Sequence, residues 1–197
     1  MAMSTTYPVQ LQLSADNQVA RWRPLVQWLL AIPHLAVVSV LTTLRHVLTV
    51  ISLFTVVFTK RIPRQLFDTV AMTYRYEWRS LSYALFLHEK YPQFDFQPGA
   101  AEPGDDNSSL TFTYPEELSR WQPLYKWLVA VPHYVVMAAL VVASIFVVVF
   151  GLVAVVVTGN YPVRARDFLV GVYRYGLRVQ AYVGLLTDEY PPFAVRS

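Results

Sequence analysis

The chain has 197 residues, of which 55% are hydrophobic and 15% aromatic, and its formal net charge at pH 7 is +3. An apolar fraction above one half is typical of membrane proteins rather than of soluble ones. The small, scattered positive charge argues against a nucleic-acid partner, and the absence of cysteine excludes disulfides, thiol catalysis and thiolate metal sites.

The first half of the chain divides into four segments. Alternating apolar and polar residues at 7–13 predict a short, half-exposed strand outside the membrane. The Trp-rich segment 21–32 predicts an amphipathic helix at the membrane interface, which Pro33 ends or kinks because proline has no amide donor. Residues 33–58 would extend about 39 Å as a helix, which is enough to cross a bilayer. After a basic turn, residues 65–87 predict a second helix with charges in its middle.

The same order of segments recurs 99 residues later. The segment Arg21 to His34 recurs as Arg120 to His133, and the register continues without a gap as far as Phe94 and Phe193. The run 134–157 contains neither charge nor proline and is too long for an ordinary strand, so it predicts a membrane-spanning helix. An internal repeat of this kind largely defines the architecture.

We therefore predict a mainly α-helical integral membrane protein with two tandem repeats, residues 1–98 and 109–197, and a polar linker at 99–108. Each repeat would hold a short extramembrane strand, an interfacial Trp-rich helix, a transmembrane helix, and a second helix that is amphipathic or crosses the membrane. In the second repeat the strand is expected at 110–112 and the second helix at 165–186.

The path of the second helices is the open question of topology. If each repeat crossed the bilayer once, its copy would be upside down, and nearly identical Trp and turn sequences would serve opposite membrane faces. Both turns are basic, so we expect four crossings, with re-entrant or interfacial second helices as the alternative. The positive-inside rule then places both turns in the cytoplasm and both termini on the other side.

One pair of charges distinguishes the first repeat from the second. Arg45 and Glu77 lie near the middle of the two predicted helices of the first repeat, where the second repeat has Ser144 and Gly176. A charge inside a membrane is costly unless it is paired. We expect an intramembrane ion pair between Arg45 and Glu77, which either locks the two helices together or serves transport or proton relay.

Each second helix also carries two arginines one turn apart, followed by a tyrosine on the same face: Arg75, Arg79 and Tyr83, and Arg174, Arg178 and Tyr182. Such a face could hold an anionic lipid phosphate by charge-assisted hydrogen bonds. The alternative is that the arginines extend to headgroups or bond the carbonyls of neighbouring segments.

Other chemistry-bearing residues fit structural roles better. Four tryptophans bracket the starts of the apolar runs and predict interfacial belts: Trp22, Trp28, Trp121 and Trp127. His34 and His133 follow the kink prolines and lack metal-ligand spacing, so we expect interfacial structural histidines. Asp68 and Asp167 fit the favourable charge at a helix N-terminus. No metal site or cofactor is expected, because the sequence contains no phosphate-binding, zinc-binding or nucleophile motif.

Three motifs of the second repeat carry a family resemblance: Thr158-Gly-Asn-Tyr-Pro, the segment 167–175 ending in Tyr-Arg-Tyr, and the closing Thr187-Asp-Glu-Tyr-Pro-Pro-Phe. With them, the chain resembles the bacterial membrane proteins that carry domain of unknown function 4389, in two tandem copies. The resemblance covers nearly the whole chain and is closer in the second repeat. It implies a multi-pass protein of the bacterial cytoplasmic (inner) membrane, and it implies no activity.

Our leading expectation is a non-enzymatic accessory or scaffold subunit of a larger membrane protein complex, embedded in the lipid bilayer beside other membrane subunits. Small residues between Ala138 and Gly151 would permit close approach of partner helices. A lipid-binding or lipid-transport protein using the paired arginines, with anionic lipid as ligand, is the alternative. An enzyme acting on headgroups through Asp68, His34 and their second-repeat counterparts is a third, weaker candidate.

Overall fold

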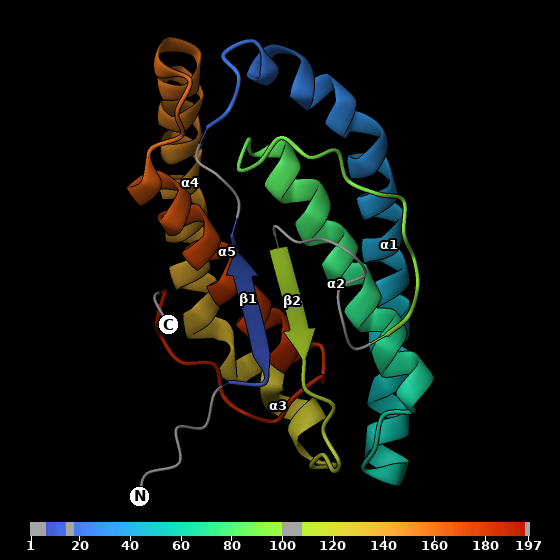
Figure 1. Ribbon diagram of the computed structural model, residues 1–197. Helices are drawn as coiled ribbons and strands as arrows, with labels where there is room; N and C mark the ends of the chain where they lie inside the picture. The colour runs from blue at the N-terminus through green and yellow to red at the C-terminus, as the bar shows by residue number, and fades with distance from the viewer. Residues whose placement is uncertain (1–6, 15–17, 100–107, 196–197) are drawn as a thin grey trace, which may run out of the picture.

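The computed structural model describes residues 7–14, 18–99 and 108–195. This part of the chain is mainly helical and forms the following elements: β1 (Val9–Leu13), α1 (Arg23–Thr59), α2 (Arg64–Ala84), β2 (Ser108–Phe112), α3 (Gln122–Val129), α4 (Val131–Thr158) and α5 (Val163–Val183) (Figure 1). Each repeat thus contributes one strand, one long apolar helix and one second helix.

The two strands pair with each other, and their register relates the two repeats in space. β1 and β2 are antiparallel, and Leu11 lies opposite Leu110, the residue 99 positions later. Val9 lies opposite Phe112, and the counterpart of this pair, Leu13 opposite Ser108, is also present. If each strand residue is replaced by its counterpart 99 positions away, the same set of β1–β2 residue pairs results. A pseudo-two-fold axis passes through the Leu11–Leu110 pair.

A second pair of contacts obeys the same symmetry. The Val19 N–H donates to the Gly159 carbonyl at 3.0 Å, and the Leu118 N–H donates to the Lys60 carbonyl at 2.8 Å. The start of α1 therefore lies beside the end of α4, and the approach to α3 lies beside the end of α1 (Figure 1). It follows that α1 and α4 run antiparallel.

This arrangement corrects the expected topology. The turn at 60–63 and the turn at 159–162 lie at opposite ends of the molecule rather than on one side. The expectation failed because it assumed that similar sequences face the same way, whereas the antiparallel strand pair turns one repeat upside down relative to the other. Four crossings are not supported either. Of the helices in the described ranges, α1 and α4 are the two that are long and apolar enough to cross a membrane.

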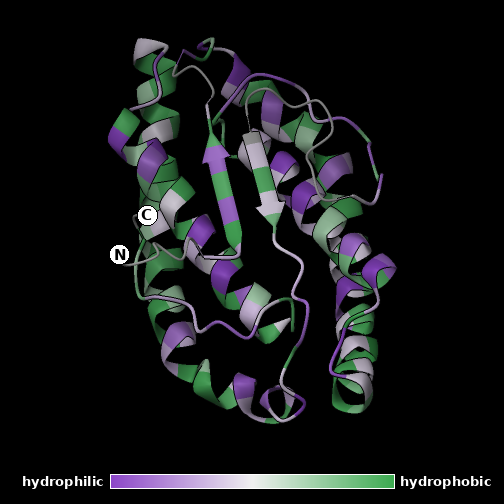
Figure 2. Cartoon of the chain, turned by 60° about the horizontal axis from the view of Figure 1, so that its bottom comes forward, coloured by the Kyte–Doolittle hydropathy of each residue, from purple (hydrophilic) through white to green (hydrophobic). Residues whose placement is uncertain are grey.

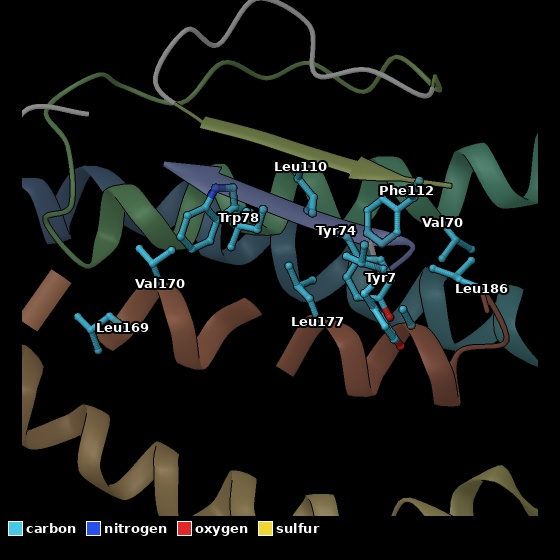
Figure 3. Packing of buried hydrophobic residues seen from close by; sticks show 14 of the residues in the cluster. Tyr7, Val70, Tyr74, Trp78, Leu110, Phe112, Leu169, Val170, Leu177 and Leu186 are labelled. Atoms are coloured by element: carbon cyan, nitrogen blue, oxygen red, sulfur yellow. The ribbon is translucent and has the colours of Figure 1, made fainter. Parts of the chain in front are cut away.

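The second helices lie inside the molecule. α2 packs against β2 and α5 packs against β1, while α1 lies along α2 and α4 lies along α5. Side chains from the strands and both second helices form one apolar core beneath the sheet, including Tyr74, Leu110 and Leu177 (Figure 3). The Trp78 ring of α2 lies 4.6 Å from the Tyr173 ring of α5. Burial by protein explains why these two helices can be amphipathic and charged.

The prediction of a separate interfacial helix in each repeat is wrong for the first repeat. There α1 runs through Pro33 as one continuous helix, whereas in the second repeat Ala130 separates α3 from α4. A proline inside a helix removes one backbone hydrogen bond, but the chain stays helical on both sides of Pro33. Even at the break, the Tyr134 N–H donates to the Ala130 carbonyl at 3.1 Å.

Candidate functional site

The structure brings Arg45 and Glu77 together. Arg45 Nη1 of α1 lies 2.7 Å from Glu77 Oε2 of α2, and the two side chains are only 7% and 14% exposed. The Arg45 guanidinium also lies 4.0 Å from the centre of the Tyr74 ring. This ion pair joins the long and second helices of the first repeat near their mid-lengths.

The second repeat has a cavity at the equivalent position. Ser144 of α4 and Gly176 of α5 line an apolar cavity of about 450 Å³, together with Met137, Val148 and Tyr173. A Cβ atom at Gly176 would approach the Met137 methyl group to 3.1 Å, so Met137 partly occupies the space of the missing side chain. The same helix pair is therefore charged in one repeat and apolar in the other.

The histidines of the repeated motif form a buried aromatic cluster in each repeat. His34 Nδ1 shares a hydrogen bond of 2.8 Å with the Tyr76 hydroxyl, and the His34 ring stacks on Phe94 at 4.2 Å. The second repeat has the same contacts, at 2.6 Å and 4.1 Å, among His133, Tyr175 and Phe193.

Both histidines are fully buried by protein, which fits a structural role, and their position at a membrane interface stays a prediction. The Pro-His motif, the Tyr-Arg-Tyr motif and the closing Tyr-Pro motif are joined in space, since each cluster connects a long helix, a second helix and the coil after it. The three motifs recur together at the same offset of 99 residues, and this shared spacing is the sequence signal from which the cluster could have been predicted.

The paired arginines hold backbone carbonyls of this chain. Arg79 Nη2 donates to the Asp95 carbonyl at 2.9 Å, and Arg178 Nη1 donates to the Ala194 carbonyl at 3.3 Å. These two bonds tie the coil after each second helix back to that helix. Arg174 donates through Nε and Nη2 to the carbonyl of Leu11 in β1, at 3.3 and 3.0 Å.

The remaining members of the predicted lipid face are also within the protein. Arg75 is 1% exposed, and Tyr83 and Tyr182 are buried. The arginines therefore do not gather on one lipid-accessible surface, and the carbonyl-bonding interpretation fits their geometry. Asp68 lies in the first turns of α2 and pairs with Arg64 at 3.3 Å.

One buried position in each repeat has a role that the sequence patterns did not predict. Gln27 Nε2 donates to the carbonyls of Tyr83 and His88, at 2.7 and 2.9 Å. Its counterpart, Lys126, donates through Nζ to the Thr187 carbonyl at 2.6 Å and to Asp188 Oδ1 at 2.7 Å.

Burial lowers the pKa of Lys126, and the hydrogen bond to Asp188 only partly offsets this effect. Gln27 fastens the start of α1 to the end of α2 and the coil after it, and Lys126 fastens the short helix α3 to the coil after α5. This shared role could not be predicted from the sequence, because Gln27 is neutral and its counterpart Lys126 is charged.

The outward faces of α1 and α4 are apolar. Hydrophobic residues follow both long helices on the two sides of the molecule, whereas β1 alternates hydrophilic and hydrophobic residues (Figure 2). Only 17% of the most apolar window of α1 and 11% of that of α4 are buried, so these are not core helices of this chain. Among the small residues of α4, Gly151 is covered from within by the Tyr161 ring rather than open to a partner helix.

The predicted interfacial tryptophans are exposed by more than half and lie in two groups. Trp22 and Trp28 lie at the start of α1, whereas Trp121 and Trp127 lie at the start of the second repeat's helices. Because the repeats are antiparallel, the groups lie at opposite ends of the molecule.

Within the described ranges, no group of three or more His, Asp or Glu residues could hold a metal ion.

A family model described as Domain of unknown function (DUF4389) matches the chain twice, at residues 21–95 and 120–195. The chain belongs to this family. The matches confirm the resemblance seen in the motifs, and each DUF4389 match spans the helices of one repeat. No curated protein and no solved structure matches the chain.

Proposed function

We propose that this DUF4389 protein is a non-enzymatic integral membrane protein that serves as an accessory or scaffold subunit of a larger complex in the bacterial cytoplasmic membrane. α1 and α4 cross the bilayer in opposite directions, with the pseudo-two-fold axis in the membrane plane. At 1.5 Å per residue, the 28 residues of α4 extend about 42 Å, more than a hydrocarbon core of roughly 30 Å.

The exposed tryptophans support this orientation. Antiparallel crossing puts Trp22 and Trp28 at one membrane surface and Trp121 and Trp127 at the other, which is where aromatic belts lie. The exposed side of α4 supports it as well, since it is apolar from Val135 to Val157 and offers water no polar side chain along that length.

The observation that carries the scaffold proposal is the polar face of the sheet. Gln10, Gln12 and Thr111 are exposed on the face opposite the core, and the strands lie alongside the middle of the long helices (Figure 1). If α1 and α4 span the bilayer, the strands lie at membrane depth and not outside the membrane, as the sequence pattern led us to expect. Lipid cannot satisfy polar side chains and strand backbone at that depth, so such a surface must face protein or a water-filled space. A partner subunit over this face provides the required contacts.

The test is mass spectrometry of the tagged full chain, extracted from its native membrane in detergent-free polymer discs. We expect a stoichiometric protein partner, which is lost in the Gln10→Arg/Gln12→Arg variant. The control is Gln65→Arg, the same substitution at an exposed site at the start of α2. Discs that contain this chain alone, or a partner retained by both variants, would refute the scaffold proposal.

A further inference from the structure

A second cavity, of about 770 Å³, lies at the start of α5. It is bounded by the end of β1, the first turns of α5 and the C-terminal coil, and its lining includes Leu13, Arg164, Arg166, Asp167, Arg174 and Ala194. Three guanidinium groups and one carboxylate thus surround a space large enough for a small anion or a lipid headgroup.

One of these arginines is held in a fixed position. Arg174 directs Nε and one N–H of Nη2 to the Leu11 carbonyl, which uses two of its five N–H donors. Ala194, which also lines the cavity, is held through its carbonyl by Arg178. A guanidinium fixed in this way presents its remaining donors without further loss of side-chain freedom, and its planar fork matches the oxygens of a phosphate.

Comparison of the two repeats shows which charged residues of the cavity are not required for folding. At the positions of Arg164 and Arg166, the first repeat has Gln65 and Phe67, although it keeps an aspartate and an arginine as counterparts of Asp167 and Arg174. The first repeat builds the same helix start with the neutral pair. Arg164 and Arg166 are therefore not needed to form this helix, although the first repeat has one cation of its own there, Arg64, where the second repeat has Val163.

We propose that this cavity binds a phosphate group, carried either by an anionic lipid headgroup or by a small soluble anion. Arg164 is exposed at its mouth, Arg166 is buried in its wall, and Arg174 lies between these extremes. Asp167 reduces the net charge and favours a ligand with hydrogen-bond donors beside the phosphate. The cavity lies just after the turn that ends α4, so under the proposed orientation it is near a membrane surface. Only the lipid source rests on the proposed membrane location.

The experiment uses the full chain in detergent micelles and measures binding of inorganic phosphate by calorimetry. Binding of phosphatidic acid is measured by calorimetry in the same micelles, with short-chain phosphatidic acid as titrant and short-chain phosphatidylcholine as the reference. The test variant is Arg164→Gln/Arg166→Phe, which installs the first repeat's residues. The control is Arg61→Gln/Arg64→Gln, which removes two exposed charges at the first turn.

We expect the test variant to weaken phosphate-group binding by at least about tenfold, since each lost charge-assisted contact contributes that order of affinity. The control should bind like the wild type. Binding of inorganic phosphate identifies a soluble ligand, whereas binding of phosphatidic acid alone identifies a headgroup. Absence of both, or equal loss in both variants, would overturn the proposal. Failure to span the membrane would leave the inorganic phosphate result unchanged.

Discussion

Removing one partner of the Arg45–Glu77 pair should destabilise the protein far more than removing both. Each side chain is less than 15% exposed, so Arg45→Met or Glu77→Met leaves the other charge buried without its counter-ion. Loss of one member of a buried pair costs about 3–5 kcal/mol, whereas apolar replacement of both is often close to neutral. We expect the double variant to be at least about 2 kcal/mol more stable than the sum of the single effects implies.

The second repeat provides the control for this cycle. Ser144→Met places the same new side chain at the counterpart of Arg45, where it extends into the cavity of about 450 Å³ and should change stability by less than about 1 kcal/mol. The assay is equilibrium unfolding in mixed micelles, followed by tryptophan fluorescence. Single variants that each cost less than about 1 kcal/mol, or a double variant whose cost is the plain sum, would refute the ion-pair reasoning.

Three further substitutions test other contacts in the same unfolding assay. Lys126→Gln introduces the glutamine that the first repeat has at this position. Burial lowers the pKa of Lys126 in the folded protein, so between the lowered pKa and 10.5 the unfolded wild type binds more protons than the folded wild type. Wild-type stability relative to this variant should therefore rise with pH across that window, and a constant difference would contradict the burial effect. Lys60→Gly should stabilise by about 1 kcal/mol, because Lys60 has φ 58° where the second repeat uses Gly159; an unchanged or lower stability would argue against backbone strain. Gly151→Ala should cost about 1–3 kcal/mol, since the added methyl overlaps the buried Tyr161 ring; a neutral effect would show that the ring can move aside.

The long helices and the repeat could be predicted because both depend on local patterns. An uninterrupted apolar run such as 134–157 predicts a helix without knowledge of its neighbours, and the offset of 99 residues is visible in the sequence alone. The Arg45–Glu77 contact could be predicted because two opposite charges occur in one repeat only. Their pairing required only that two consecutive helices pack side by side.

The relative direction of the repeats could not be predicted, because an offset carries no information on the symmetry axis. That axis follows from the pairing of Leu11 with Leu110, a contact between strands that each had only weak local signals. The contact of Arg174 with β1 could not be predicted for the same reason, because it depends on the relative direction of the repeats. Arg174 meets the Leu11 carbonyl only because β1 of one repeat lies against α5 of the other.

The proposed crossing of the membrane by the two repeats in opposite directions is tested most directly by labelling two single-cysteine variants, Lys60→Cys and Asn160→Cys. The chain contains no cysteine of its own, and these positions lie in the two equivalent turns. A membrane-impermeant maleimide is applied to intact cells and to inside-out vesicles. We expect one turn to react only in cells and the other only in vesicles. Labelling of both turns from the same side would contradict the antiparallel crossing of α1 and α4.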